Sequence, residues 1–198
     1  MNMNLPNRLT LLRVVMIPVF VLFMQLSTGG GAAAPLREAM TGGFRLYRYL
    51  ACAVFIIASL TDFLDGKIAR SRHLVTDFGK FMDPLADKLL VCSALIMLTA
   101  EGSLPAIAVL IIIAREFIIS GFRLIAADKG IVIAASWWGK IKTTMQMILC
   151  IILILPQMPL ILGSIVIRIL IAVVVLLTLI SLIDYMKQNI NVITDGGM

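Results

Sequence analysis

The stretch Thr61–Lys88, TDFLDGKIARSRHLVTDFGKFMDPLADK, decides how this chain of 198 residues is organised. Five of the chain's eleven acidic residues stand in it, and four of these form two pairs at helical intervals. Asp62 and Asp65 are three residues apart, and Asp83 and Asp87 are four apart, so each pair shares one face of a predicted helix. The sequence therefore predicts two helices whose adjoining ends each carry a pair of carboxylates.

Apolar segments flank this stretch, LACAVFIIASL before it and LLVCSALIMLTA after it. Carboxylates beside such segments are costly unless they have a partner, and four of them close together repel one another. Oxygen ligands without cysteine or neighbouring histidine favour Mg²⁺, Mn²⁺ or Ca²⁺ over zinc. The alternative is a set of ordinary helix-end charges that pair with nearby basic residues, namely Lys67, Arg70, Lys80 and Lys88.

The composition predicts an integral membrane protein. Hydrophobic residues make up 61% of the chain and charged residues only 14%, and the mean hydropathy is +1.04. A soluble domain of this size rarely exceeds half apolar. The net charge of +6 therefore suggests contact with anionic lipid headgroups and phosphorylated substrates, and we expect no nucleic-acid partner.

We expect an all-α protein that forms a single domain over residues 1–198. The first predicted helix has an amphipathic N-terminal half, with Arg8 and Arg13, which we expect at the membrane interface or snorkelling to lipid phosphates. A Gly- and Ala-rich loop over 28–43 follows it, and Pro156 and Pro159 predict a tight turn before the last helix. Six transmembrane helices are expected, over 5–27, 44–70, 77–100, 104–129, 136–155 and 160–187.

Six crossings would leave both termini on one side of the membrane. Most lysines and arginines of the predicted connections fall on the side of the N-terminus, together with the acidic stretch. Arg37, Arg45 and Arg48 fall on the opposite side and are outnumbered. The positive-inside rule therefore predicts that both termini and the acidic site are cytoplasmic.

The acidic stretch resembles the CDP-alcohol phosphotransferase family, whose pattern is D-x2-D-G-x2-A-R-x8-G-x3-D-x3-D. All eight positions match, at Asp62, Asp65, Gly66, Ala69, Arg70, Gly79, Asp83 and Asp87. The resemblance implies the fold of that family, a homodimer, and two Mg²⁺ or Mn²⁺ ions held by the four aspartates. It further implies that Asp87 is the general base, and that the CDP-linked lipid contacts Asp62, Gly66, Ala69, Arg70 and Gly79.

Two further segments, NLPNRLTLLRVVMIP and AREFIISGFRLIAADKGIVIAASWWGKIKT, resemble one bacterial branch of the family. That branch transfers the phosphatidyl group of CDP-diacylglycerol to sn-glycerol 3-phosphate, and gives phosphatidylglycerophosphate and CMP at the plasma membrane. A phosphorylated acceptor needs cations, and we expect them to be Arg115, Arg123, Lys140 and Lys142.

Alternatives remain open for both the basic residues and the reaction. The four cations could instead pair with Glu116, Asp128 or lipid phosphate. The acceptor could be inositol phosphate, serine or phosphatidylglycerol. A divalent-cation transporter that uses the same aspartates is a third reading, although a cation path gains nothing from a cleft that fits cytidine.

Overall fold

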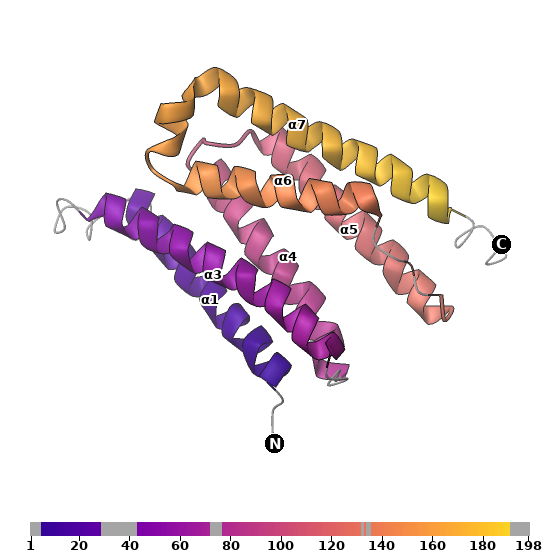
Figure 1. The fold of residues 1–198 in the computed structure, drawn as a ribbon. Helices are drawn as coiled ribbons and strands as arrows, with labels where there is room; N and C mark the ends of the chain where they lie inside the picture. The colour runs from indigo at the N-terminus through magenta and orange to yellow at the C-terminus, as the bar shows by residue number, and fades with distance from the viewer. Residues whose placement is uncertain (1–4, 29–42, 72–76, 132, 134–135, 191–198) are drawn as a thin grey trace. The chain divides into compact units, whose positions relative to one another are not determined.

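A computed structural model describes residues 5–28, 43–71, 77–131, 133 and 136–190, and within these ranges the side chains of all residues except 5–9, 44, 62–71, 77–81, 83–84 and 87. The regular structure of the described residues is helical (Figure 1). The helices are α1 (Leu5–Thr28), α3 (Phe44–Ser71), α4 (Asp77–Ala100), α5 (Ala106–Asp128), α6 (Trp137–Ile154) and α7 (Met158–Asn189). The expected loop 28–43 lies, apart from its ends, outside the described residues.

The predicted helices are confirmed, with boundaries that differ by at most two residues for all six. The turn predicted at Pro156 and Pro159 is wrong in one respect, because α7 already begins at Met158 and takes Pro159 into its first turn. Proline is tolerated there, since the first turn of a helix has no internal partner for its missing N–H. The backbone departs from helical geometry at Gly163 instead, where φ is 75° and ψ is 159°.

Two helices end in the same glycine motif. After α5, Gly130 has φ 71°, its N–H donates to the Ala127 carbonyl at 3.0 Å, and the Ile131 N–H donates to the Ala126 carbonyl at 2.8 Å. Gly102 ends α4 in the same way with φ 79°. A left-handed residue at this place satisfies the last carbonyls of a helix, and glycine adopts it without steric cost.

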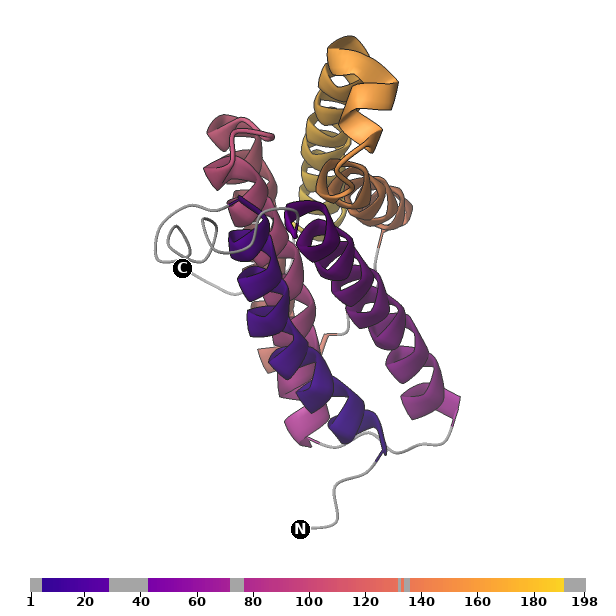
Figure 2. The same ribbon diagram turned by 90° about the vertical axis from the view of Figure 1, so that its left-hand side faces the viewer.

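The chain divides into two compact units, which are described separately. Unit 1 comprises residues 1–103 and 151–159, and unit 2 comprises residues 104–150 and 160–198. In unit 1, α1 packs against both α3 and α4. The beginning of α1, the end of α3 and the beginning of α4 lie at one end of this unit in both views (Figures 1 and 2).

The core of unit 1 combines aromatic and small side chains. Phe20 of α1 and Phe55 of α3 are fully buried, and their ring centroids are 5.7 Å apart. Small residues allow helices to approach closely, which is how many membrane helices pack. The fully buried alanines of α3 and α4 fit this description: Ala51, Ala58, Ala86 and Ala94.

Unit 2 contains α5, the first part of α6, and α7 from Leu160 onward. Its buried residues include a cluster of Ile119 and Phe122 from α5 with Tyr185 from α7. The Phe122 and Tyr185 rings meet edge to face, with centroids 6.2 Å apart and planes at 87°. This unit also buries several polar side chains, namely Arg115, Lys142, Gln146, Thr178 and Ser181.

The outward faces of the helices are apolar as well. Large hydrophobic side chains are exposed along α1, α5 and α7, among them Leu12, Leu110, Phe117, Leu160 and Ile165. Of the described residues, two stretches are long and apolar enough to cross a membrane, Thr10–Thr28 and Met158–Asn189. A helix that is apolar on all sides suits a lipid environment, so these surfaces fit the expected membrane protein.

Candidate active site

Both acidic pairs lie on helices of unit 1 that are joined by residues 72–76. Asp65 is six residues before the end of α3, and Asp83 is six residues after the start of α4. Each therefore stands about 9 Å from its helix end, since a helix rises about 1.5 Å per residue. Asp62 and Asp87 follow one turn deeper. The chain reverses between the two helices (Figure 1), so the pairs lie at similar distances from the connection.

The helical backbone confirms that each acidic pair shares a helix face. The side chains of the whole motif lie outside the described residues, so the roles predicted for Gly66, Ala69, Arg70 and Gly79 and for the four aspartates stay predictions. Among the residues with described side chains, no group of three or more His, Cys, Asp or Glu is arranged to hold a metal ion. The acidic motif thus remains the candidate metal site.

Arg13 is a buried cation on the helix that packs against both acidic helices. Its side chain is 0% exposed, as is that of Thr10 one turn earlier. The expectation that Arg13 snorkels to lipid phosphate is therefore wrong, because snorkelling needs an exposed guanidinium. A buried guanidinium requires an anionic partner. Arg13 lies eight residues into α1, about 12 Å from its start, at the same end of unit 1 as the aspartates.

In unit 2, two of the four predicted acceptor-binding cations share one carboxylate. Glu116 Oε1 accepts hydrogen bonds from Arg115 Nη1, at 3.2 Å, and from Lys142 Nζ. Arg115 also donates through Nη2 to the Ser181 hydroxyl of α7. Lys142 is 0% exposed and Arg115 is 7% exposed. Three helices therefore meet at a buried cluster of charged groups.

The start of α6 is shaped to leave room for this cluster. A Cβ atom at Gly139 would come within 3.2 Å of Arg115 Nη2 and 3.4 Å of Ser136 Oγ. The first of these is closer than nine in ten of the contacts that real Cβ atoms make. The absence of a side chain at Gly139 thus lets the guanidinium lie against α6.

The other two predicted cations lie differently. The Arg123 guanidinium lies over the Tyr185 ring, 5.8 Å from its centroid, so it borders the same part of α7. Lys140 is exposed and lies 5.9 Å from the centroid of the Trp137 ring. Residues two apart on a helix do not face the same way, which explains why Lys142 is buried and Lys140 is not.

Comparison with known proteins agrees with the motif. The family model described as CDP-alcohol phosphatidyltransferase matches residues 3–182. The chain belongs to the CDP-alcohol phosphatidyltransferase family. It is 46% identical over 157 residues, 79% of each chain, to a Bacillus subtilis protein named CDP-diacylglycerol--glycerol-3-phosphate 3-phosphatidyltransferase.

Two further relatives carry related names. A Mycobacterium tuberculosis (strain H37Rv) protein named probable phosphatidylglycerophosphate synthase is 39% identical over 196 residues, 98% of this chain and 85% of its own. A Rickettsia prowazekii protein with the same name as the Bacillus relative is 41% identical over 152 residues, 77% of this chain and 75% of its own. Membership of a transferase family sets aside the reading of the chain as a cation transporter.

The alternative that the cations pair with Glu116 is confirmed for Arg115 and Lys142. Two other residues that contact the basic cluster of this CDP-alcohol phosphatidyltransferase, Ser181 and Tyr185, were not predicted from the sequence. The spacing of polar residues in α7 does, however, indicate Ser181 and Tyr185. Thr178, Ser181 and Tyr185 recur at intervals of three and four in a largely apolar helix, which places them on one face. Polar groups on one face of a membrane helix are usually functional.

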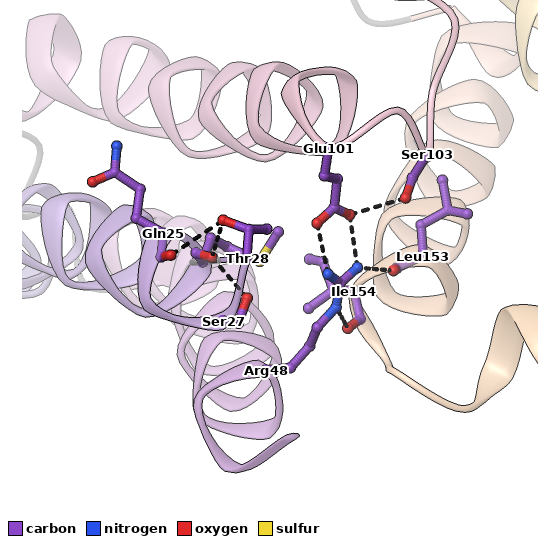
Figure 3. A network of polar contacts seen from close by, with 9 residues as sticks. Gln25, Ser27, Thr28, Arg48, Glu101, Ser103, Leu153 and Ile154 are labelled. Carbon is purple, nitrogen blue, oxygen red and sulfur yellow. Dashed lines mark hydrogen bonds and ion pairs between the residues drawn. The ribbon is translucent and has the colours of Figure 1, made fainter. Parts of the chain in front are cut away.

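A second polar network joins the start of α3 to the end of α4, which are the opposite ends of these helices from the aspartates. Figure 3 shows this network from close by. Arg48 of α3 makes a two-pronged ion pair with Glu101, with Nη1–Oε2 at 2.6 Å and Nη2–Oε1 at 2.7 Å. It also donates to the carbonyls of Ile154 and Leu153, each at 2.7 Å. Arg48 was one of the arginines that departed from the expected charge asymmetry, and the paired carboxylate explains how it is accommodated there.

Proposed function

We propose that this chain transfers the phosphatidyl group of CDP-diacylglycerol to sn-glycerol 3-phosphate, which releases CMP and forms phosphatidylglycerophosphate. The observation that carries the choice of acceptor is the buried convergence of Arg115 and Lys142 in unit 2. Glycerol 3-phosphate carries about two negative charges near neutral pH. Glu116 neutralises only one of the two buried positive charges, so the cluster keeps an excess positive charge that an anionic acceptor can balance. An acceptor without a phosphate, such as serine or inositol, would not require it.

The acidic motif fits a divalent cation, and we propose that Asp62, Asp65, Asp83 and Asp87 hold two Mg²⁺ or Mn²⁺ ions. The donor set consists of hard carboxylate oxygens on two helix faces of one unit. The chemistry that such ions supply when bound is neutralisation of the pyrophosphate and of the charge that develops on CMP. Metal dependence of the transfer follows from this proposal and is open to direct test.

The remaining motif residues are assigned to the CDP-linked lipid. We propose that the guanidinium of Arg70 binds a phosphate oxygen pair, for which its planar fork is suited. Gly66, Ala69 and Gly79 would leave room for the nucleotide to approach the backbone.

Asp87 would accept the proton of the attacking hydroxyl. Beside two cations it would be a weak base, so its contribution depends on being close to a hydroxyl that is already polarised.

We propose that Arg115 and Lys142 bind the acceptor's phosphate directly, with Glu116 holding the two side chains in place. A carboxylate that binds both cations fixes their geometry before the substrate arrives, which lowers the ordering cost of binding. Arg123 and Lys140 remain predictions for the same role, with Arg123 nearer to the cluster because it contacts Tyr185.

The membrane arrangement is part of the proposal. We infer that α1 and α3 to α7 form six crossings of a bacterial plasma membrane within a single catalytic domain, in a homodimer. The basic connections support a topology in which both termini and the acidic motif face the cytoplasm. The apolar outer faces of the helices support their contact with membrane lipids.

The purified protein in detergent micelles tests this function. CDP-diacylglycerol is supplied with one acceptor at a time, glycerol 3-phosphate, glycerol, serine, inositol phosphate or phosphatidylglycerol, and CMP release is measured. The proposal expects rapid release with glycerol 3-phosphate and much slower release with the others. Preference for serine or inositol phosphate would move the chain to another branch of the family.

A further inference from the structure

The buried face of α1 changes from apolar to polar along the helix. Phe20 and Met24, in its second half, are 0% exposed, and so are Thr10 and Arg13 in its first half. The spacings between these four residues are three, seven and four, so they form one helical face. Because α1 packs against α3 and α4, the polar part of this face lies inside unit 1, at the end where α3 finishes and α4 begins (Figures 1 and 2).

A fully buried guanidinium such as that of Arg13 needs an anion beside it. The acidic residues of unit 1 are Glu38, Glu101 and the five aspartates of the stretch 61–88. Both carboxylate oxygens of Glu101 accept hydrogen bonds from Arg48, at the opposite ends of α3 and α4. Glu38 belongs to the connection after Thr28, and Arg13 stands fifteen residues before Thr28 on α1, about 22 Å away. The aspartates are the anions that remain.

Arg13 and the motif aspartates lie at similar depths in unit 1. Arg13 is about 12 Å from the start of α1, Asp62 is about 14 Å from the end of α3, and Asp87 is about 15 Å from the start of α4, at about 1.5 Å per residue. The other two motif aspartates are one turn nearer to the helix ends. Asp77 is the first residue of α4 and lies well outside this level.

We propose that Arg13 is a positioning residue for the metal site: its guanidinium hydrogen bonds the carboxylate of a motif aspartate and fixes the orientation in which that carboxylate holds a metal ion. The inference rests on the proposed function, of which the metal site is part. A carboxylate has about four acceptor positions, so it can accept from an arginine and still bind a metal. The positive charge also offsets the mutual repulsion of four carboxylates before any metal ion arrives.

The first test titrates Mn²⁺ alone into the purified full chain in detergent, without substrates, and follows free Mn²⁺ by electron paramagnetic resonance. Arg13→Met keeps an unbranched side chain and removes the charge. It should weaken Mn²⁺ binding by about 10- to 100-fold, the usual effect of losing a hydrogen-bond partner of a metal ligand. Arg13→Lys keeps the charge without the planar fork and should recover part of the loss. Arg45→Met is the matched control, since Arg45 is exposed on α3, and its affinity should equal that of the wild type.

Thermal unfolding in EDTA tests the ion pair without a metal. Arg13→Met should lower the melting temperature by about 10 °C, because a buried carboxylate loses its cation. Each motif aspartate is then replaced by asparagine, both in the wild type and in Arg13→Met. At the partner of Arg13, asparagine should lower the melting temperature of the wild type and raise that of Arg13→Met. Relief of repulsion among the carboxylates alone would raise both.

An Arg13→Met variant with the Mn²⁺ affinity of the wild type would overturn the proposal, and so would the absence of that change of sign at all four aspartates. An unchanged Mn²⁺ affinity with a higher KM for CDP-diacylglycerol would assign Arg13 to the phosphates of the donor instead. If Arg13→Met does not fold, recovery of folding by one asparagine substitution supports the ion pair, and failure of all four contradicts it.

Failure of the proposed function is seen separately. A wild type that binds no Mn²⁺ would remove the metal site and this inference with it. A wild type that binds Mn²⁺ and does not use glycerol 3-phosphate would contradict the proposed acceptor alone.

Discussion

Truncation of Arg48 should destabilise the protein by a large and specific amount. Its guanidinium makes four hydrogen bonds of 2.6 to 2.7 Å, two to the carboxylate of Glu101 and two to the last carbonyls of α6, Leu153 and Ile154. Glu101 also accepts from Ser103 Oγ at 3.0 Å. The side chains of Arg48 and Glu101 are only 17% and 8% exposed, so water replaces few of these contacts after truncation.

The loss in the free energy of unfolding can be worked out from the groups that Arg48→Ala leaves without a partner. A largely buried carboxylate would lose its cation, which costs about 3–5 kcal/mol in comparable pairs. The carbonyls of Leu153 and Ile154 would also lose their hydrogen bonds. They lie at the end of α6, where no later backbone N–H of the helix can replace the lost donor. For a chain of this size about 1 kcal/mol corresponds to roughly 2–4 °C, so the melting temperature should fall by about 10 °C.

A double-mutant cycle isolates the ion pair. Arg48→Met with Glu101→Leu removes both charges, and well-packed apolar replacements of a buried pair are often nearly neutral. The double variant should therefore be more stable than Arg48→Met alone, with a coupling energy towards the upper end of about 0.5–3 kcal/mol. The assay is thermal unfolding of the purified protein in a mild detergent.

Arg45→Ala is the matched control, because Arg45 lies on the same helix, three residues earlier, and is exposed. Its melting temperature should stay close to that of the wild type. The KM values of Arg48→Ala at low temperature should also stay unchanged, since the network lies at the opposite end of unit 1 from the acidic motif. A melting temperature for Arg48→Ala equal to that of Arg45→Ala would refute the reasoning.

Three further predictions concern the chemistry. EDTA should abolish CMP release and Mg²⁺ or Mn²⁺ should restore it, while Asp62→Ala should lower the rate by at least ~10²-fold; normal turnover in EDTA would exclude the proposed metal site. Asp87→Asn should still bind CDP-diacylglycerol while transfer falls by ~10²–10⁴-fold, and lost lipid binding would instead mark Asp87 chiefly as a ligand. Lys142→Ala should raise the KM for glycerol 3-phosphate by about ten- to a hundred-fold, whereas Lys187→Ala, at the exposed end of α7, should not.

The helices could be predicted well because the sequence marks their ends. Long apolar runs are interrupted at Gly102 and Gly130, which leaves few other positions at which a helix could end. Both glycines adopt the left-handed conformation that ends a helix. The start of α7 was predicted less well, since two prolines usually indicate a turn. Which of several prolines and glycines carries the bend depends on packing, and here Gly163 carries it.

The candidate site was predictable in its residues and less so in its contacts. Arg115 and Arg123 are eight residues apart, which leaves about 80° between them around a helix; this is why Arg115 is buried while Arg123 is exposed. Their partners Ser181 and Tyr185 lie more than fifty residues away in the sequence. Such pairings arise from the tertiary fold, and no local pattern specifies them.

The central claim is that the acceptor keeps its phosphate when it joins the lipid. Its most direct test supplies ³²P-labelled glycerol 3-phosphate and CDP-diacylglycerol to the purified protein, and measures both labelled lipid and free CMP. The account predicts one labelled phosphatidylglycerophosphate for each CMP released. CMP release with the label left in the aqueous phase, or equal transfer to unphosphorylated glycerol, would contradict it.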